Sequence, residues 1–196
     1  MKRTEIMRER EANLAWFGAA ALAALIALGG AVPAAAGDIG IRLGYYGGAD
    51  ADDPVPVVGV YDRLDIPGPL NLEISADYRN ESLRGGDLEA VVVPVRVSAV
   101  LNFFPGVSPY LLAGVGADYT SISFHNELSG EGDETDLVYE AHAGVGLELG
   151  LGPLSVVGDL RYCLVGEVSN AAVESALGHA YDPSGWYVSV SAGFSF

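Results

Sequence analysis

The chain has a single cysteine and almost no positive charge beyond its first residues. Cys163 is the only cysteine among 196 residues, so no disulfide can form within the chain. Residues 1–36 hold four of the ten basic residues and three of the 26 acidic ones. This leaves six arginines against 23 carboxylates, a net charge of −17, for residues 37–196. A surface this acidic repels phosphate groups, so we expect no nucleic acid partner.

Long apolar runs are also missing after residue 36. A membrane-spanning helix needs about 20 consecutive apolar residues, and no such run follows. A disordered acidic chain is excluded as well, because 50% of the residues are hydrophobic. A β-strand crosses a bilayer with only about 9–11 alternating residues, so the composition is compatible with a membrane-spanning β-barrel.

Residues 1–36 have the order of a secretory signal. Basic residues come first, an apolar run follows over 14–32, and Pro33-Ala34-Ala35-Ala36 ends it. This order predicts cleavage after Ala36, and therefore a signal over 1–36 followed by one domain over 37–196. The alternative is an uncleaved inner-membrane anchor, since the apolar run is nearly long enough to span a bilayer.

Period-2 alternation dominates the rest of the chain and is clearest at its end. From Trp186 to Phe196 apolar residues share one face and small or polar residues the other, as in an extended strand. An exposed aromatic strand edge invites aggregation, and closure of the sheet into a barrel removes that edge. The same pattern predicts eight strands, over 38–47, 56–64, 70–79, 88–103, 109–124, 137–149, 153–165 and 185–196.

The connections between these strands alternate in length. Residues 65–69, 104–108 and 150–152 form tight links. Longer links, which contain most of the acidic residues, lie between them at 48–55, 80–87, 125–136 and 166–184. Outer-membrane barrels have short periplasmic turns and long external loops, and this alternation places every long link on the external side.

Alternation alone does not decide which face is inside, since a water-soluble barrel buries its apolar face. The charges on the polar face decide it, because five arginines there meet six carboxylates and buried charges must be paired. Asp62 is an exception, since it falls on the apolar face. We therefore predict a structural ion-pair network inside the barrel, formed by Arg42, Arg63, Glu73, Asp77, Arg79, Arg96, Asp118, Glu140, His142, Glu148, Asp159 and Arg161.

Four segments make the chain similar to the small outer-membrane β-barrels of the OmpA/OmpX type: Pro109–Tyr119, Ala143–Leu149, Asp159–Tyr162 and Phe194–Phe196. The resemblance covers residues 38–196 and implies a place in the bacterial outer membrane. In that group the final aromatic strand is read by the barrel-assembly machinery. The resemblance therefore implies an assembly signal formed by Trp186, Val188, Val190, Phe194 and Phe196.

Other patterns suggest chemistry only weakly. Glu140 and His142, with Asp159 and Arg161 one strand away, could form an acid/base site, but a satisfied ion-pair network is the favoured interpretation, because an eight-stranded lumen has room for little besides side chains. The acidic stretch 127–136 lacks the regular ligand spacing of a calcium loop, so we expect no metal site. A lipid A-modifying acyl hydrolase would use a histidine, a serine and an acid near the external rim. Its candidates are Ser123, His125, Glu127 and Ser129.

The sequence thus predicts an all-β protein, an eight-stranded antiparallel up-and-down transmembrane β-barrel preceded by a signal peptide. We expect a monomer with a structural or surface-interaction role, without catalytic residues or cofactors. Its partners would be outer-membrane lipid, the assembly machinery and a ligand of the external links. The alternatives are a lipid A-modifying enzyme and a narrow channel.

Overall fold

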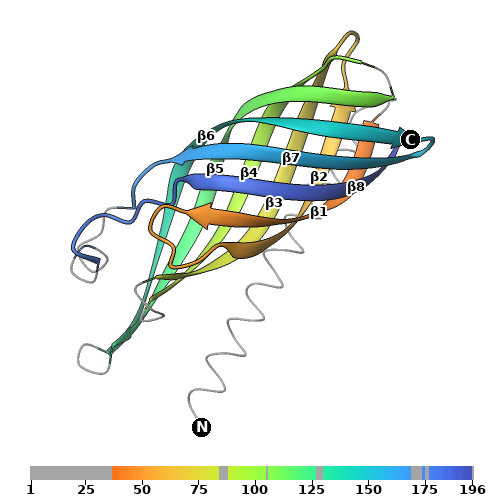
Figure 1. Ribbon diagram of the computed structural model, residues 1–196. Helices are drawn as coiled ribbons and strands as arrows, with labels where there is room; N and C mark the ends of the chain where they lie inside the picture. Colours follow the sequence, from red (N-terminus) through yellow and green to blue (C-terminus); the bar gives the residue numbers. More distant parts are fainter. Residues whose placement is uncertain are drawn as a thin grey trace. The chain divides into compact units, whose positions relative to one another are not determined.

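The computed structural model describes residues 37–83, 88–104, 106–126, 130–168, 174 and 177–195, all within one compact unit. The predicted signal over 1–36 lies outside them. Eight strands form a closed antiparallel barrel in which each strand pairs with its neighbour in sequence and β1 pairs with β8 (Figure 1). The strands are β1 (Gly37–Gly48), β2 (Val55–Asp65), β3 (Leu70–Leu83), β4 (Leu88–Asn102), β5 (Val107–Asn126), β6 (Gly130–Leu151), β7 (Leu154–Val165) and β8 (Gly185–Ser195).

The predicted fold and all eight strands are confirmed, but three strands are longer than predicted. β3, β5 and β6 continue into the segments 80–87 and 125–136, which the sequence pattern assigned to external links. Those segments are rich in polar residues, which are typical of loops. Hydrogen-bonded pairing of β5 with β6 nevertheless continues to Asn126↔Gly130. Strand pairing depends on backbone hydrogen bonds, so the polarity of these side chains does not end the strands.

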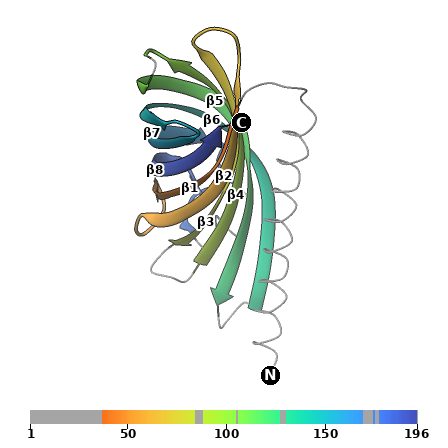
Figure 2. The ribbon, with the colours of Figure 1, turned by 90° about the vertical axis from the view of Figure 1, so that its right-hand side faces the viewer.

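The extension makes the barrel wall uneven in height. β5 and β6 have 20 and 22 residues, whereas β1, β2, β7 and β8 have 11 or 12. Figures 1 and 2 show β5 and β6 reaching beyond the other strands at the end opposite the C-terminus. At the C-terminal end the turns are short, and Gly68 and Gly152 adopt positive φ values of 110° and 74° in two of them. Only glycine adopts such angles without strain.

Side chains alternate strictly between the two faces of the wall. Along β8, for example, every second residue from Trp186 to Phe194 is exposed or nearly so, and the residues between them are buried. The five arginines of the polar face are all buried, whereas the exposed positions of the strands are mostly apolar. The apolar face therefore points outward and the charged face inward, the reverse of a water-soluble barrel.

Exposed aromatic side chains flank the apolar outer face at both ends. Tyr45, Tyr139, Tyr162 and Trp186 lie toward the external end, and Phe103, Phe104 and Phe194 lie near the tight turns. On β8, Trp186 and Phe194 are eight residues apart, which is ~20 Å along the barrel axis at about 3.3 Å per residue and a tilt of about 40°. This height is close to the apolar band of about 25 Å that outer-membrane barrels present to lipid.

Candidate functional site

A single carboxylate holds three arginines in the half of the lumen near the tight turns. Glu73 on β3 is fully buried, with 0% of its surface exposed. Its carboxylate accepts hydrogen bonds from Arg63 at 2.6 Å, Arg42 at 2.7 Å and Arg161 at 2.9 Å. These arginines come from β2, β1 and β7, so Glu73 joins strands on different sides of the barrel.

Further acids and tyrosines complete this cluster. Arg161 also donates to Asp159 at 2.7 Å, and Arg63 donates to Glu148 at 2.7 Å. The Arg63 guanidinium lies 5.3 Å from the centre of the Tyr110 ring, within the range of a cation–π contact. The buried arginine side chains in this half of the lumen are thus paired with carboxylates, and the guanidinium group of Arg63 also packs against an aromatic ring.

A second cluster is centred on Arg96 of β4. Arg96 donates to Asp77 at 2.6 Å and to both oxygens of Glu140, at 2.6 and 2.8 Å. On the other side of Glu140, His142 Nδ1 lies 2.8 Å from Glu140 Oε1, and His142 Nε2 lies 2.8 Å from Ser98 Oγ. All five side chains are buried.

Ser98, His142 and Glu140 stand in the order of a nucleophile, a base and an orienting acid. A working site of this kind needs a place for the reacting atom next to the serine. Here Ser98 has no exposed surface, and the backbone of Gly114 approaches Ser98 and His142 closely enough that a Cβ would clash. Glu140 is also held bidentately by Arg96. The described side chains therefore leave no place for a reacting atom beside Ser98.

A third cluster lies at the external mouth of the barrel. Arg79 donates to Glu81 at 2.5 Å and to Asp118 at 3.4 Å, and its guanidinium lies 3.9 Å from the centre of the Tyr46 ring. Tyr181, from the connection between β7 and β8, donates its hydroxyl to Glu81 at 2.7 Å. Burial raises the pKa of Tyr181, and the Glu81 charge raises it further, so the hydroxyl keeps its proton.

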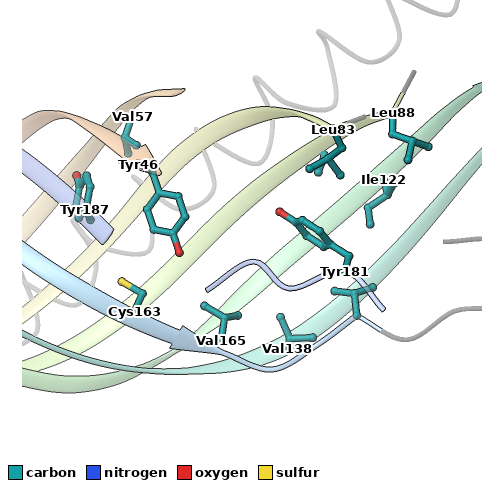
Figure 3. Close-up of a cluster of buried hydrophobic side chains, with 12 residues drawn as sticks. Tyr46, Val57, Leu83, Leu88, Ile122, Val138, Cys163, Val165, Tyr181 and Tyr187 are labelled. Carbon is teal, nitrogen blue, oxygen red and sulfur yellow. The ribbon is translucent and has the colours of Figure 1, made fainter. Parts of the chain in front are cut away.

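The described residues of the connection between β7 and β8 pack against this mouth. Val168 and Tyr181 form a bridge and are buried in an apolar cluster with Leu83, Leu88 and Ile122 (Figure 3). The Tyr46 hydroxyl donates to the Pro183 carbonyl at 2.6 Å. Two more hydrogen bonds tie this connection to the one after β1, from Ala49 N to Ser184 O and from Asp182 N to Asp50 Oδ2, both 2.7 Å.

Eleven of the twelve residues predicted for the lumen network take part in ion pairs, and the twelfth, His142, lies 2.8 Å from Glu140. All twelve are buried except Glu148, which is partly buried. Sequence reasoning missed Glu81, because it assigned residues 80–87 to a link. The signal was present, since Asp77, Arg79 and Glu81 continue one alternation along β3. No individual tyrosine was named for the network, because tyrosine occurs on both faces of the strands.

The structure describes only part of the predicted assembly signal and of the acyl-hydrolase candidates. Of the assembly-signal residues, Trp186, Val188, Val190 and Phe194 lie on the outer face of β8, and Phe196 lies outside the described residues. Ser123, a candidate of the acyl-hydrolase alternative, is buried in β5. The side chains of His125, Glu127 and Ser129 fall outside the description.

Within the described ranges no group of three or more His, Cys, Asp or Glu side chains is arranged to hold a metal ion. No helix among those residues is long and apolar enough to cross a membrane.

Tyrosine rings cross the lumen where the facing residue has no side chain. A Cβ at Gly146 of β6 would overlap the ring of Tyr110, which stacks with Arg63 and donates to Asp159. We expect Gly146→Ala to displace this ring and destabilise the barrel by about 1–3 kcal/mol, the usual cost of overpacking. The measurement is the urea midpoint of the refolded protein. Gly150→Ala on the same strand is the control, because its Cβ would meet only the Gly106 carbonyl at 3.7 Å. Equal midpoints for the two variants would contradict the packing argument.

No protein-family model and no curated protein sequence matches the chain. Several solved structures do. A major outer membrane protein from Thermus thermophilus is 14% identical, with a TM-score of 0.63 over 83% of this chain and 100% of that one. Neisserial surface protein A is 12% identical, with a TM-score of 0.55 over 82% and 96%. Ail, the attachment invasion locus protein of Yersinia pestis, is 15% identical, with a TM-score of 0.51 over 82% and 97%. These matches confirm the resemblance drawn from the sequence motifs: the chain has the fold of the small eight-stranded outer-membrane β-barrels.

Proposed function

We propose that the chain is an integral protein of the bacterial outer membrane with a structural or surface-interaction role. The observation that carries this proposal is the exposed apolar face, bounded by aromatic side chains at both ends, around a buried charged interior. Exposed apolar surface of this extent is a liability in water and matches lipid instead. The fold similarity to outer-membrane proteins supports the same environment.

The lumen has a structural role in this proposal. Three clusters of ion pairs, around Glu73, Arg96 and Arg79, support this role, and Tyr181 packs against the last of them. A narrow channel would need a continuous open path for water, and an eight-stranded barrel has room for little besides its own side chains. Recognition would therefore depend on the external strand ends and links, and insertion on lipid contacts and on recognition of β8 by the assembly machinery.

The test is electrophoresis of the outer-membrane fraction in SDS, with and without boiling. A closed barrel that resists detergent is expected to run faster when unheated and to shift on boiling. The boiled sample marks the position of the single chain. An unheated band that runs close to or ahead of that position indicates a monomer. A protein absent from that fraction and soluble in water would contradict the proposal and turn attention to ligands of a soluble barrel.

A further inference from the structure

Carboxylates outnumber basic side chains at the end of the lumen near the tight turns, where the C-terminus also lies (Figure 1). We call the rim formed there by Asp38 of β1, Asp65 of β2 and Glu148 of β6 the turn-side mouth. Asp38 and Asp65 both act electrostatically on Glu148. Arg63 donates to Glu148, but it also shares Glu73 with two other arginines. The tight links contain no lysine or arginine, so the mouth keeps excess negative charge.

Two acceptors without a hydrogen-bond partner face the same mouth. Ser108 of β5 is 6% exposed and lies directly opposite Glu148 in the register of β5 and β6. Its Oγ has no hydrogen-bond partner among the described residues. The same is true of the buried Oδ1 atom of Asn102 on β4, and Asn102 is a diagonal neighbour of Ser108. Opposite and diagonal residues on one face of a sheet have Cβ atoms within about 8 Å, so both acceptors lie near the Glu148 carboxylate.

The mouth is reached from the solution and has an apolar layer below it. The side chain of Glu148 is 19% exposed, and Asp65 at the end of β2 is exposed. Deeper in the lumen lies a buried apolar cluster formed by Val100, Tyr110, Leu112 and Val157. A ligand can therefore reach the acceptors from the turn side and needs no path through the lumen.

The polar groups of this mouth select a cation that donates hydrogen bonds. A buried acceptor without a donor is costly, and a primary ammonium supplies three N–H donors and no acceptor. Such a group can satisfy Ser108 Oγ, Asn102 Oδ1 and the Glu148 oxygen that Arg63 does not use. The described carboxylates are not arranged to hold a metal ion, which favours an organic cation. The surrounding negative charge repels anions.

We propose that the turn-side mouth binds a primary ammonium group, held by Glu148, Ser108 and Asn102. The charges of Asp38 and Asp65 attract the group to the mouth. Soluble diamines and diamino acids carry such a group, and so does the ethanolamine headgroup of a phospholipid. The approach of the ligand from the periplasm rests on the proposed function, whereas the site itself needs only the closed barrel.

The first experiment titrates the refolded full barrel with the diamine cadaverine. The isotope-labelled barrel is held in micelles of a neutral detergent at constant ionic strength, after the gel test has shown that it is closed. Backbone amide chemical shifts report binding residue by residue, and we expect saturable shifts at Asn102, Ser108 and Glu148. Pentamethonium, in which both nitrogens of the same diamine are fully methylated, keeps the charge without N–H donors and should bind about five-fold or more weakly.

Two pairs of variants locate the site. Ser108→Ala removes an acceptor that has no partner within the protein, so it should weaken cadaverine binding about three-fold or more without lowering the urea midpoint. Its matched control is Ser75→Ala, which removes another buried, unpartnered hydroxyl deeper in the lumen and should leave binding unchanged. Glu148→Gln should weaken binding about ten-fold, and Asp53→Asn in the link after β1 should not change it. Should Glu148→Gln fail to fold, the serine pair still decides the question.

A second experiment, in lipid nanodiscs without added amine, identifies the source of the ammonium. The headgroup of phosphatidylethanolamine carries a primary ammonium, whereas the nitrogen of phosphatidylcholine has no N–H. A lipid ligand should produce the shifts at Ser108 and Glu148 in phosphatidylethanolamine alone. Equal spectra in the two lipids, together with shifts on addition of cadaverine, would identify a soluble amine as the ligand.

The remaining outcomes contradict the inference. Equal binding of cadaverine and pentamethonium would show attraction between charges without hydrogen bonding. Unchanged binding by Ser108→Ala would place the amine elsewhere. A closed barrel whose amides shift with neither source would leave water as the partner of these acceptors. A protein that fails the gel test overturns the proposed function instead.

Discussion

Glu73→Gln is expected to destabilise the barrel by about 3–5 kcal/mol, the cost of removing one partner from a buried ion pair. The glutamine keeps the shape of the side chain, so no cavity forms. It removes the negative charge that Arg42, Arg63 and Arg161 share, and its amide group adds donors where only acceptors are needed. The measurement is equilibrium unfolding of the refolded protein in urea, followed through the fluorescence of Trp186.

Two further variants make this test specific. Asp53→Asn removes an exposed charge and should change the free energy of unfolding by less than about 0.5 kcal/mol. The double variant Glu73→Gln/Arg42→Gln removes one charge of each sign and should recover part of the loss, because Arg63 and Arg161 keep Glu148 and Asp159 as partners, whereas the ion pair of Arg42 is with Glu73. A Glu73→Gln barrel as stable as Asp53→Asn would contradict the role assigned to this carboxylate.

Val190→Arg is expected to cost about 2–4 kcal/mol in a lipid bilayer, the penalty for a cation at the middle of the lipid face of a barrel. Val190 lies midway between Trp186 and Phe194 on β8 and is 61% exposed. In water a substitution at such an exposed position would change stability little. The effect therefore distinguishes a lipid-facing surface from a wet one.

The measurement compares unfolding free energies of refolded protein in lipid vesicles. Asp53→Arg, in the link between β1 and β2, introduces the same side chain outside the apolar band and should have almost no effect. If Val190→Arg were as stable as Asp53→Arg, the outer face of β8 would contact water and the proposed membrane location would be wrong.

The sequence alone was sufficient to predict the barrel, because period-2 alternation and alternating link lengths are local properties. It was also sufficient to decide which face is inside, since charge balance on one face does not depend on three-dimensional detail. The limits of β3, β5 and β6 were not predictable in this way. Residues 125–136 are as polar as a loop, and only the pairing of β5 with β6, up to Asn126↔Gly130, shows that both strands continue into this segment.

The specific ion-pair partners inside the lumen could not be predicted from the sequence either. Asp77, Arg96 and Glu140 come from three different strands, and their meeting depends on the stagger of the closed sheet. The packing of the connection between β7 and β8 against the third cluster was not predicted either. Tyr181 belongs to a long link whose sequence gives no sign that the chain folds back onto Glu81.

The position of Glu73 also bears on how the barrel forms. Arg63 is on the adjacent strand β2 and Arg42 is on β1, next to β2, but Arg161 reaches Glu73 from β7, four strands away from β3 in either direction around the barrel. An open sheet that has not yet sealed β1 against β8 leaves Arg161 far from the carboxylate. The favourable pairing therefore arises only at closure, and opening the seam would cost the contacts of strands that lie on both sides of it. The lumen charges would in this way make closure cooperative and slow the release of any single strand from the membrane.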